Sequence, residues 1–323
     1  MEEHLSTPAA VTKSPENAPA ESQGDAVRAA ACPVCGRDSW RRDDLAQVML
    51  SLPDSFLVLR CESCGLRRLD PYLSPDELQR LYGPAYFGDD SAATGMDGVR
   101  CPDGNYLADY VPARVKKFRH TVKQLRSLRP SGRTLLDFGA ATGDFVAIAR
   151  DEGLHADGVE LSSYAIDVAR KRHGIQLHLG GCEAIPRHRY DFIHLHHVFE
   201  HLARPAAELS SLVDHLAPGG ILYIEIPYQF HMLERLRYRL KQGARQETPT
   251  LFSFHHPFFY TPESLRRMLE RAGLDVISVR TFVPGHYEAN GVTRRIKKAG
   301  WWVVDRMFHL GNIIEAVAIC PER

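Results

Sequence analysis

The sequence predicts an α/β protein with a doubly wound, mostly parallel seven-stranded sheet, preceded by a small cysteine-bearing module. Two observations lead to this prediction. From residue 132 onward, short apolar segments alternate with segments of helical spacing, which is typical of a parallel sheet covered by helices on both faces. Upstream of that region, two Cys-x-x-Cys pairs are each followed by Gly, which is typical of a metal-binding module.

Apolar runs and turn signals place each element of the sheet. The expected strands are 133–138, a segment ending at 158–161, a weaker one near 176–179, then 190–195, 220–226, 276–280 and 313–319. Helices are expected at 163–171, 205–215 and 262–272. Residues 229–258 interrupt the alternation and are rich in Arg and aromatic residues. Their length predicts an inserted cap over the strand ends.

The chain divides into four predicted parts. Residues 1–30 are rich in Glu, Ser, Pro and Ala and are expected to form a disordered tail. The cysteine module spans 31–72, a helical connector spans 73–131, and the main domain spans 132–323. The connector contains aromatic residues that either pack on the main domain or cover a ligand as a lid: Tyr82, Tyr86, Phe87, Tyr106 and Tyr110.

Bulk composition excludes several classes of protein. The chain has 323 residues with a formal net charge of zero, which argues against broad binding of nucleic acid. There is no apolar run of the roughly 20 residues that a membrane helix needs, and the first residues lack the apolar segment of a secretory signal. Three of the seven cysteines are scattered, so the set is not a disulfide framework. A cytoplasmic protein without membrane contact is expected, and its oligomeric state is not determined.

The four paired cysteines are Cys32, Cys35, Cys61 and Cys64. Each pair can form a knuckle in which the following Gly permits the turn that aims backbone N–H groups at sulfur. Two such knuckles predict a closed zinc-ribbon module with a four-thiolate zinc site, and the gap between them can hold a hairpin with 56–59 as one strand. A closed site is structural and not catalytic. The alternative is four unrelated reduced cysteines.

A glycine-bearing turn follows the first strand and predicts a nucleotide site. Gly139, Ala141 and Gly143 alternate in this turn, which lets a ligand approach the backbone at the start of a helix. Asp137 at the strand end would repel a pyrophosphate but attract an ammonium or sulfonium group. This charge favours S-adenosylmethionine (SAM) over NAD.

Further cofactor contacts are expected at the ends of the next two strands. Glu160, followed by Leu161, lies where an acid can accept hydrogen bonds from both ribose hydroxyls. The alternative for Glu160 is a solvated acid at a helix start. Cys182 and Glu183 follow the third strand, where the backbone would meet the adenine edge. Cys182 is interpreted as a small wall residue and not as a nucleophile, because no charged partner is evident.

A histidine-rich segment follows the strand 190–195 and supplies the candidate catalytic groups. His194 lies within the strand and is expected to pack there, whereas His196 is expected beside the cofactor. His197 and His201 are four residues apart, which predicts one shared helix face with Glu200 adjoining them.

Three roles remain open for this segment. In the first, His201 is a general base that Glu200 orients. In the second, His197, Glu200 and His201 bind a divalent metal together with His255 or His256. In the third, the histidines are only structural.

These motifs together resemble the class I SAM-dependent methyltransferases over residues from about 102 to the end of the chain. The resemblance rests on Asp137-x-Gly139-x-Ala141-x-Gly143, Glu160, the strand 190–195 leading into Val198-Phe-Glu-His-Leu202, and Leu216-Ala-Pro-Gly-Gly220. Ala141 departs from the usual Gly; we expect a negative φ there and weakened binding. Gly181 stands where the family often has an acid, which leaves adenine to backbone groups and Glu183.

The combination with a cysteine module resembles a bacterial group that modifies sugars, polysaccharide ends or small natural products. It implies a SAM-dependent methyltransferase with structural Zn²⁺ and a small-molecule or glycan acceptor. The resemblance places the Glu200-His201 pair beside that acceptor. The sequence identifies neither the acceptor nor the methylated atom. One alternative is an RNA methyltransferase with a zinc module, and the other is a non-catalytic SAM-fold scaffold that binds a partner protein.

Overall fold

The computed structural model describes residues 31–50, 52, 55–72, 112–240, 256–283 and 311–322. All elements below belong to one compact unit, residues 31–323. The predicted tail and the aromatic residues of the predicted lid lie outside the described residues, as does His255. Among the described residues, no helix is long and apolar enough to cross a membrane.

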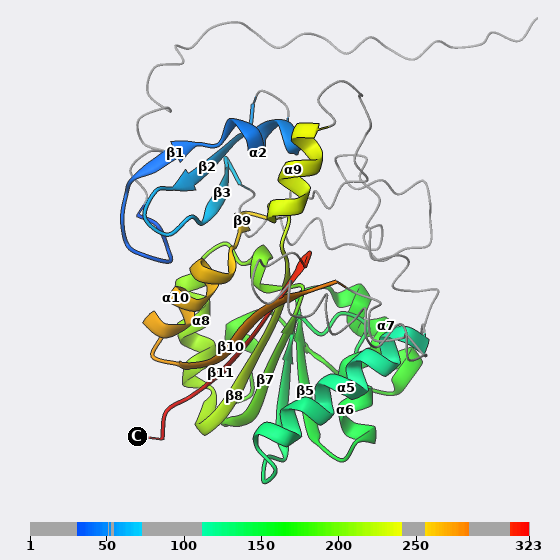
Figure 1. Cartoon of the computed structure of the whole chain (residues 1–323). Helices are drawn as coiled ribbons and strands as arrows, with labels where there is room; N and C mark the ends of the chain where they lie inside the picture. The colour runs from blue at the N-terminus through cyan, green and yellow to red at the C-terminus, as the bar shows by residue number, and fades with distance from the viewer. Residues whose placement is uncertain are drawn as a thin grey trace, which may run out of the picture. The chain divides into compact units, whose positions relative to one another are not determined.

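The main sheet has seven strands in the order β10-β11-β8-β7-β4-β5-β6 (Figure 1). Strands β8, β7, β4, β5 and β6 are parallel, and β11 runs antiparallel to both β8 and β10. This confirms the predicted doubly wound, mostly parallel sheet. The strands are β4 Thr134–Phe138, β5 His155–Glu160, β6 His178–Leu179, β7 Tyr190–His196, β8 Leu216–Pro227, β10 Asp275–Phe282 and β11 Ile313–Ile319.

Helices cover both faces of this sheet because its central strands are apolar on both faces. Leu135 packs in one core with helices α5, α6 and α7, and the next residue, Leu136, packs in the other core with α8 and α10. Adjacent residues of a strand point to opposite faces, so each buried strand contributes to both cores. The helices are α5 Pro112–Leu128, α6 Asp144–Asp151, α7 Ser163–His173, α8 Pro205–Asp214 and α10 Pro262–Arg271.

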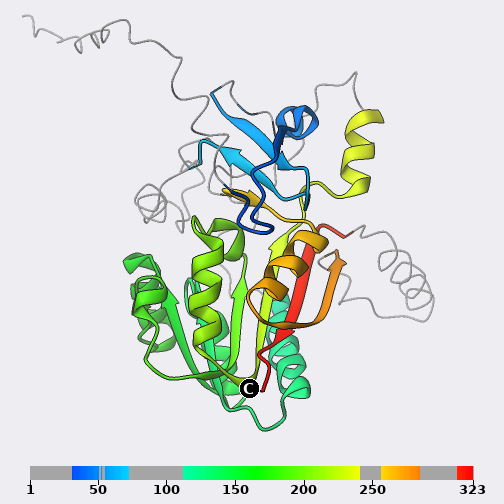
Figure 2. The ribbon, with the colours of Figure 1, turned by 90° about the vertical axis from the view of Figure 1, so that its left-hand side faces the viewer.

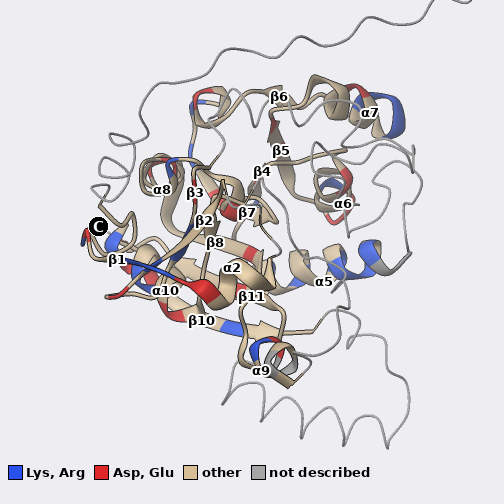
Figure 3. Cartoon of the chain, turned by 90° about the horizontal axis from the view of Figure 1, so that it is seen from above, with Lys and Arg blue, Asp and Glu red and all other residues tan. Residues whose placement is uncertain are grey.

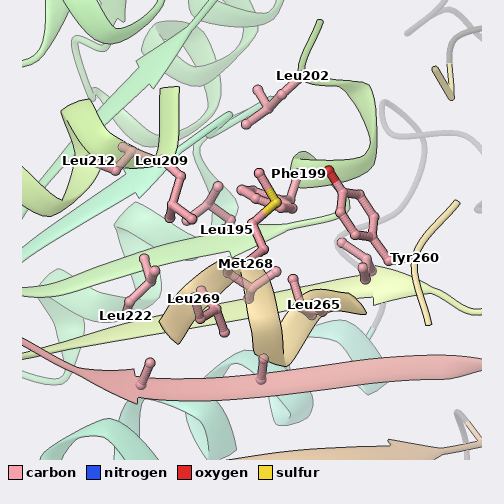
Figure 4. Close-up of a cluster of buried hydrophobic side chains, with 14 of the residues drawn as sticks. Leu195, Phe199, Leu202, Leu209, Leu212, Leu222, Tyr260, Leu265, Met268 and Leu269 are labelled. Carbon is pink, nitrogen blue, oxygen red and sulfur yellow. The ribbon is translucent and has the colours of Figure 1, made fainter. Parts of the chain in front are cut away.

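The core under α8 and α10 also supports the segment that follows β7. Met268 and Leu269 of α10 lie with Leu195 of β7 and with Phe199 just beyond it (Figure 4). Full burial of a Leu or Met side chain contributes about 2 kcal/mol to folding. The chain after β7 is therefore fixed by apolar packing from beneath.

The helix ends follow from local capping. Helix α7 begins after Ser162, whose hydroxyl accepts from Ala165 N, and ends at Gly174 with φ +67°. Helix α10 begins with a reciprocal pair of bonds between Thr261 and Ser264. The three predicted helices agree with the structure to within two residues at each end.

The cysteine module forms an antiparallel sheet in the order β1-β2-β3-β9 (Figure 2). Strands β1 and β2 are the predicted hairpin, although helix α2 between them was not predicted. Strand β9 lies at the C-terminal end of the region predicted as a cap, and it pairs with β3 of the module. Tertiary pairing thus ties the module to the main domain. The elements are β1 Trp40–Arg42, α2 Asp44–Met49, β2 Leu57–Cys61, β3 Arg67–Asp70 and β9 Phe258–Phe259.

Three further elements complete the described chain. Two are single 3₁₀ turns, η1 Cys182–Ala184 and η2 Phe199–His201, and the third is helix α9 Met232–Leu240. Both 3₁₀ turns follow carboxyl ends of parallel strands, where ligands bind in open α/β sheets.

Candidate active site and four-cysteine cluster

The turn after β4 is built from left-handed residues. Gly139, Ala141 and Gly143 have φ of +79°, +46° and +75°. The expectation of a negative φ at Ala141 is therefore wrong: its left-handed conformation is held by a bond from its N–H to Glu160 Oε2 at 2.8 Å. A left-handed alanine costs about 1–2 kcal/mol. Gly139 has a stricter requirement, because an added Cβ would lie 2.3 Å from Val198 Cγ2.

Glu160 joins this turn to the next helix. Its side chain is buried, so the alternative of a solvated acid is wrong. Besides the bond from Ala141, its Oε1 accepts from Ser162 N at 2.9 Å. Burial raises the pKa of this carboxyl, while the backbone N–H donors oppose that rise. Each carboxylate oxygen has a second lone pair, so both can still accept from ribose hydroxyls.

Asp137 is less open than its sequence position suggested. It is 3% exposed, and its Oδ1 lies 2.7 Å from Nδ1 of His194. His194 is buried and its ring stacks on Phe145 with centroids 3.7 Å apart, as the predicted packing role requires. Direct contact between Asp137 and a cofactor ammonium stays a prediction. His194 holds the carboxylate in place at the end of β4.

The segment after β6 carries polar groups, and an exposed leucine follows β5. Glu183 Oε1 accepts from Gly181 N at 2.7 Å, and such backbone bonds lower the pKa of Glu183. Cys182 points its sulfur toward Glu208 O at 3.8 Å, and burial raises the pKa of its thiol to about 11. A protonated, half-buried thiol suits a wall residue. Leu161, directly after β5, is 39% exposed.

His197 leaves the strand through a left-handed conformation with φ +55°. Its N–H donates to Glu225 O of β8 at 2.8 Å, so its backbone is still bonded to the sheet. Helix geometry begins only at Phe199 and lasts for a single 3₁₀ turn. The prediction that His197 and His201 share a helix face is therefore wrong. Left-handed non-glycine residues are uncommon and are often found at functional sites.

Glu200 and His201 lie on that 3₁₀ turn. Glu200 is 2% exposed, and neither carboxylate oxygen has a hydrogen-bond partner among the described residues. Its Oε1 lies 3.8 Å from His201 Nε2 and 3.5 Å from His197 Nδ1. His256 packs edge-on against His201 with ring centroids 4.5 Å apart, and its Nδ1 lies 3.0 Å from Gln229 Nε2.

The histidines separate into two groups, which bears on the metal alternative. His201 and His256 surround Glu200, whereas the ring of His197 also faces Glu225 at 3.7 Å and belongs with His196. In the second group, Lys117 donates to His196 Nε2 at 2.9 Å and to Glu225 Oε1. An ammonium at that position disfavours a metal ion there. Three ligands of the alternative, Glu200, His201 and His256, lie close enough to hold a metal ion, whereas His197 belongs to the other group.

The four paired cysteines meet in space. Their sulfurs all lie within 4.8 Å of one another, with Cys32–Cys64 and Cys35–Cys61 each at 3.5 Å. A Zn–S distance of about 2.3 Å gives sulfur–sulfur edges of about 3.8 Å, so the cluster fits a tetrahedral zinc ion. The Cys64 thiol, with backbone N–H donors of Val34 and Cys35, lowers the pKa of Cys32 to about 5, although burial opposes this.

The cluster lies against the main domain. Cys32 and Cys64 share an apolar core with Phe199, Leu202 and Tyr260. The cysteine knuckles thereby support the chain that carries Glu200 and His201.

Sequence reasoning missed two residues of the site. Glu225 is 1% exposed, and the signal for it was an acid within the apolar run 221–226. Lys117 lies on α5, where several Lys and Arg residues occur, and nothing in the sequence distinguishes it from its neighbours (Figure 3).

The sheet order, the left-handed turn after β4 and the acid at the end of β5 are features of the class I SAM-dependent methyltransferase fold. The profile of the family described as "Methyltransferase domain" matches residues 109–279, and the chain belongs to this family.

Similar proteins include C-methyltransferase NovU of Streptomyces niveus, which is 24% identical over 270 residues. That match covers 77% of this chain and 57% of NovU, so the chain spans somewhat more than half the length of this relative. The plantazolicin methyltransferase BpumL in complex with SAH is similar over 76% of this chain and 95% of its own, with 15% identity and a TM-score of 0.49. A SAM-dependent methyltransferase from Archaeoglobus fulgidus is similar over 65% of this chain and 100% of the Archaeoglobus chain, with 19% identity and a TM-score of 0.43.

Proposed function

We propose that this methyltransferase transfers a methyl group to a carbon atom of a small-molecule or sugar acceptor, with His201 as general base. The observation that carries the base assignment is Glu200, a buried carboxylate without a hydrogen-bond partner among the described residues and 3.8 Å from His201. A buried carboxylate beside an imidazole stabilises the imidazolium that forms when the imidazole takes a proton. His197 and His256 flank this pair and restrict its orientation.

Residues at the other strand ends would hold the cofactor. Glu160 has the position and free lone pairs to accept from ribose hydroxyls, and Glu183 with the backbone near Gly181 would meet the adenine. Leu161 and Cys182 would line the walls, and Asp137 would face the amino-acid end. SAM, when bound, supplies an electrophilic methyl group on a positively charged sulfur.

The acceptor class is supported by likeness and by charge. The relative NovU is named a C-methyltransferase, which favours carbon as the methylated atom. The chain has no net charge, in keeping with a small acceptor and not a long polyanion. A C–H group next to a carbonyl group is acidic enough for a positioned histidine base to remove its proton.

The four-cysteine cluster would hold a structural zinc ion within the module 31–72. All four positions of a tetrahedral ion are supplied by thiolates, so no site remains for a substrate. Its contribution to the reaction is to support the chain that carries the Glu200–His201 pair.

The proposal is tested with SAM carrying a labelled methyl group and a panel of keto sugars, free and nucleotide-linked. His201→Ala should lower turnover by about 10²–10⁴-fold while SAM affinity, measured by calorimetry, stays near that of the wild type. His215→Ala is the matched control, because His215 bonds Ser211 O and lies at the amino ends of β7 and β8, whereas His201 follows the carboxyl end of β7. Unchanged turnover in His201→Ala would exclude the base role, and no SAM binding by the wild type would exclude the cofactor site.

A further inference from the structure

Lys117 lies at the edge of the candidate site without belonging to any of its motifs. It occupies the second turn of α5, and its side chain is 28% exposed. Its ammonium group bonds both Glu225 Oε1 and His196 Nε2, the latter at 2.9 Å. One cation thus contacts a buried carboxylate on β8 and an imidazole at the end of β7.

The chemistry of this contact fixes the form of His196. An ammonium group has three N–H donors and no acceptor, so His196 Nε2 must accept with its lone pair. The imidazole is then neutral and carries its proton on Nδ1. Without Lys117, the nearest charge to His196 Nε2 would be Glu225 Oε1 at 3.4 Å, which favours the imidazolium form.

Besides Lys117, the neighbouring group that can place a positive charge beside His196 is the His197 imidazole. His194 of β7 and His197, which follows the strand, are the ring neighbours of His196, at centroid distances of 6.1 and 4.5 Å. On α5, Phe118 packs edge-on at 5.4 Å. On the far side of Glu225, Tyr223 OH lies 3.3 Å from Glu225 Oε2 and 2.9 Å from Glu315 Oε2, and its single proton can be donated to either carboxylate.

Two of those neighbours, Glu315 and His197, have charged partners of their own. Glu315 is bound by Arg280 of β10, at 2.7 Å, and by Gln124 of α5. His197 also faces Glu200. Burial and then the Lys117 charge move the pKa of His196 well below its usual value, while the Glu225 charge opposes this.

We propose that Lys117 is a positioning residue of the cofactor site: it pairs with Glu225 and donates to His196, so that no imidazolium forms beside the cationic cofactor. The inference rests on the proposed function in one respect, the placement of His196 beside SAM. Replacing Lys117 by Met removes the ammonium group but leaves the buried carboxylate of Glu225 next to His196. The His196 imidazole then takes up a proton. The positive charge moves from the lysine to an imidazole at the cofactor site, where it repels the sulfonium group.

The first test does not depend on any acceptor. Histidine ¹⁵N resonances are followed from pH 8 to pH 5 in the full chain, with His196→Gln used to assign the His196 signal. In the wild type, His196 should stay neutral throughout. In Lys117→Met its pKa should rise into the titrated range, whereas Lys117→Arg, which keeps the charge, should resemble the wild type.

Two variants guard this test. Lys116→Met is the matched control, because Lys116 is the preceding residue on α5 and is exposed. Lys117→Gln retains an N–H donor without the charge and should give the same titration as Lys117→Met, so it serves if the Met variant does not fold. A His196 that remains neutral down to pH 5 in the folded uncharged variant overturns the proposal.

The second test measures SAM affinity by calorimetry between pH 8 and pH 6. The ratio of the Lys117→Met Kd to the wild-type Kd should grow as pH falls, by up to about tenfold per pH unit below the new pKa of His196. A constant ratio, with His196 protonated in the variant, overturns the link between Lys117 and the cofactor. If the wild type binds no SAM, the proposed function fails, while the ¹⁵N titration still decides the Lys117–His196 relation.

Discussion

Gly139→Ala should destabilise the protein through one identifiable contact. An added Cβ would lie 2.3 Å from Val198 Cγ2 and 3.0 Å from Cγ1, at a residue whose φ is +79°. The left-handed backbone alone costs an alanine about 1–2 kcal/mol. Overpacking against Val198 adds about 1–3 kcal/mol, because Val198 must move by about 1 Å to restore ordinary contact. The expected loss in the free energy of unfolding is about 2–5 kcal/mol.

A second glycine separates the two contributions. Gly153, just after α6, has φ +86° with no atom within 4 Å of the added Cβ. Gly153→Ala therefore carries the backbone cost without the clash. Guanidinium unfolding of both variants, followed by circular dichroism, should show Gly139→Ala less stable by about 1–3 kcal/mol. Equal stability of the two variants would refute the reasoning.

The same contact links stability to the site. Val198 lies between His197 and the 3₁₀ turn with Glu200 and His201, so its displacement moves the candidate base. Val198→Ala in the Gly139→Ala background removes both Cγ atoms that clash and should recover part of the lost stability. A double-mutant cycle with no coupling between the two positions would place the cost elsewhere.

Three further outcomes are expected. Glu160→Gln should weaken SAM binding by about tenfold or more in calorimetry, because an amide cannot accept from two ribose hydroxyls as a carboxylate does; the exposed Asp167→Asn should bind as the wild type, and equal affinities would exclude Glu160 from the site. Cys64→Ser should lose the zinc measured by atomic emission, whereas Cys182→Ser, outside the cluster, should retain it; full zinc in Cys64→Ser would argue against the four-thiolate site. Iodoacetamide should label Cys182 slowly at pH 7, with a rate that rises about tenfold per pH unit up to its pKa of about 11, as judged against Cys182→Ser; rapid labelling at pH 7 would contradict a protonated thiol.

Local pattern was enough to predict the sheet and the position of the glycine-bearing turn after β4. Strand residues such as Leu135 and Leu136 are apolar whichever face they occupy, so a run of them marks a buried strand before any partner is known. The spacing of Gly139 and Gly143 likewise marks a turn before any partner is known, because glycine is favoured where φ is positive. The prediction failed at Ala141, whose left-handed conformation depends on the bond that its N–H donates to Glu160.

The sequence by itself determined the kind of fold, the cysteine pairs and the residue types available at the ends of the strands. Only the tertiary structure decided which of them meet. In the tertiary structure, the N–H of His197 bonds β8, so this residue lies outside the helical turn. Strand β9 pairs with a strand of the cysteine module, and Lys117 bonds Glu225 and His196. These contacts join residues distant in sequence, and their partners are selected by the packing of whole helices and strands. Periodicity reports which face of an element is buried, but not which charged group from another element will be found there.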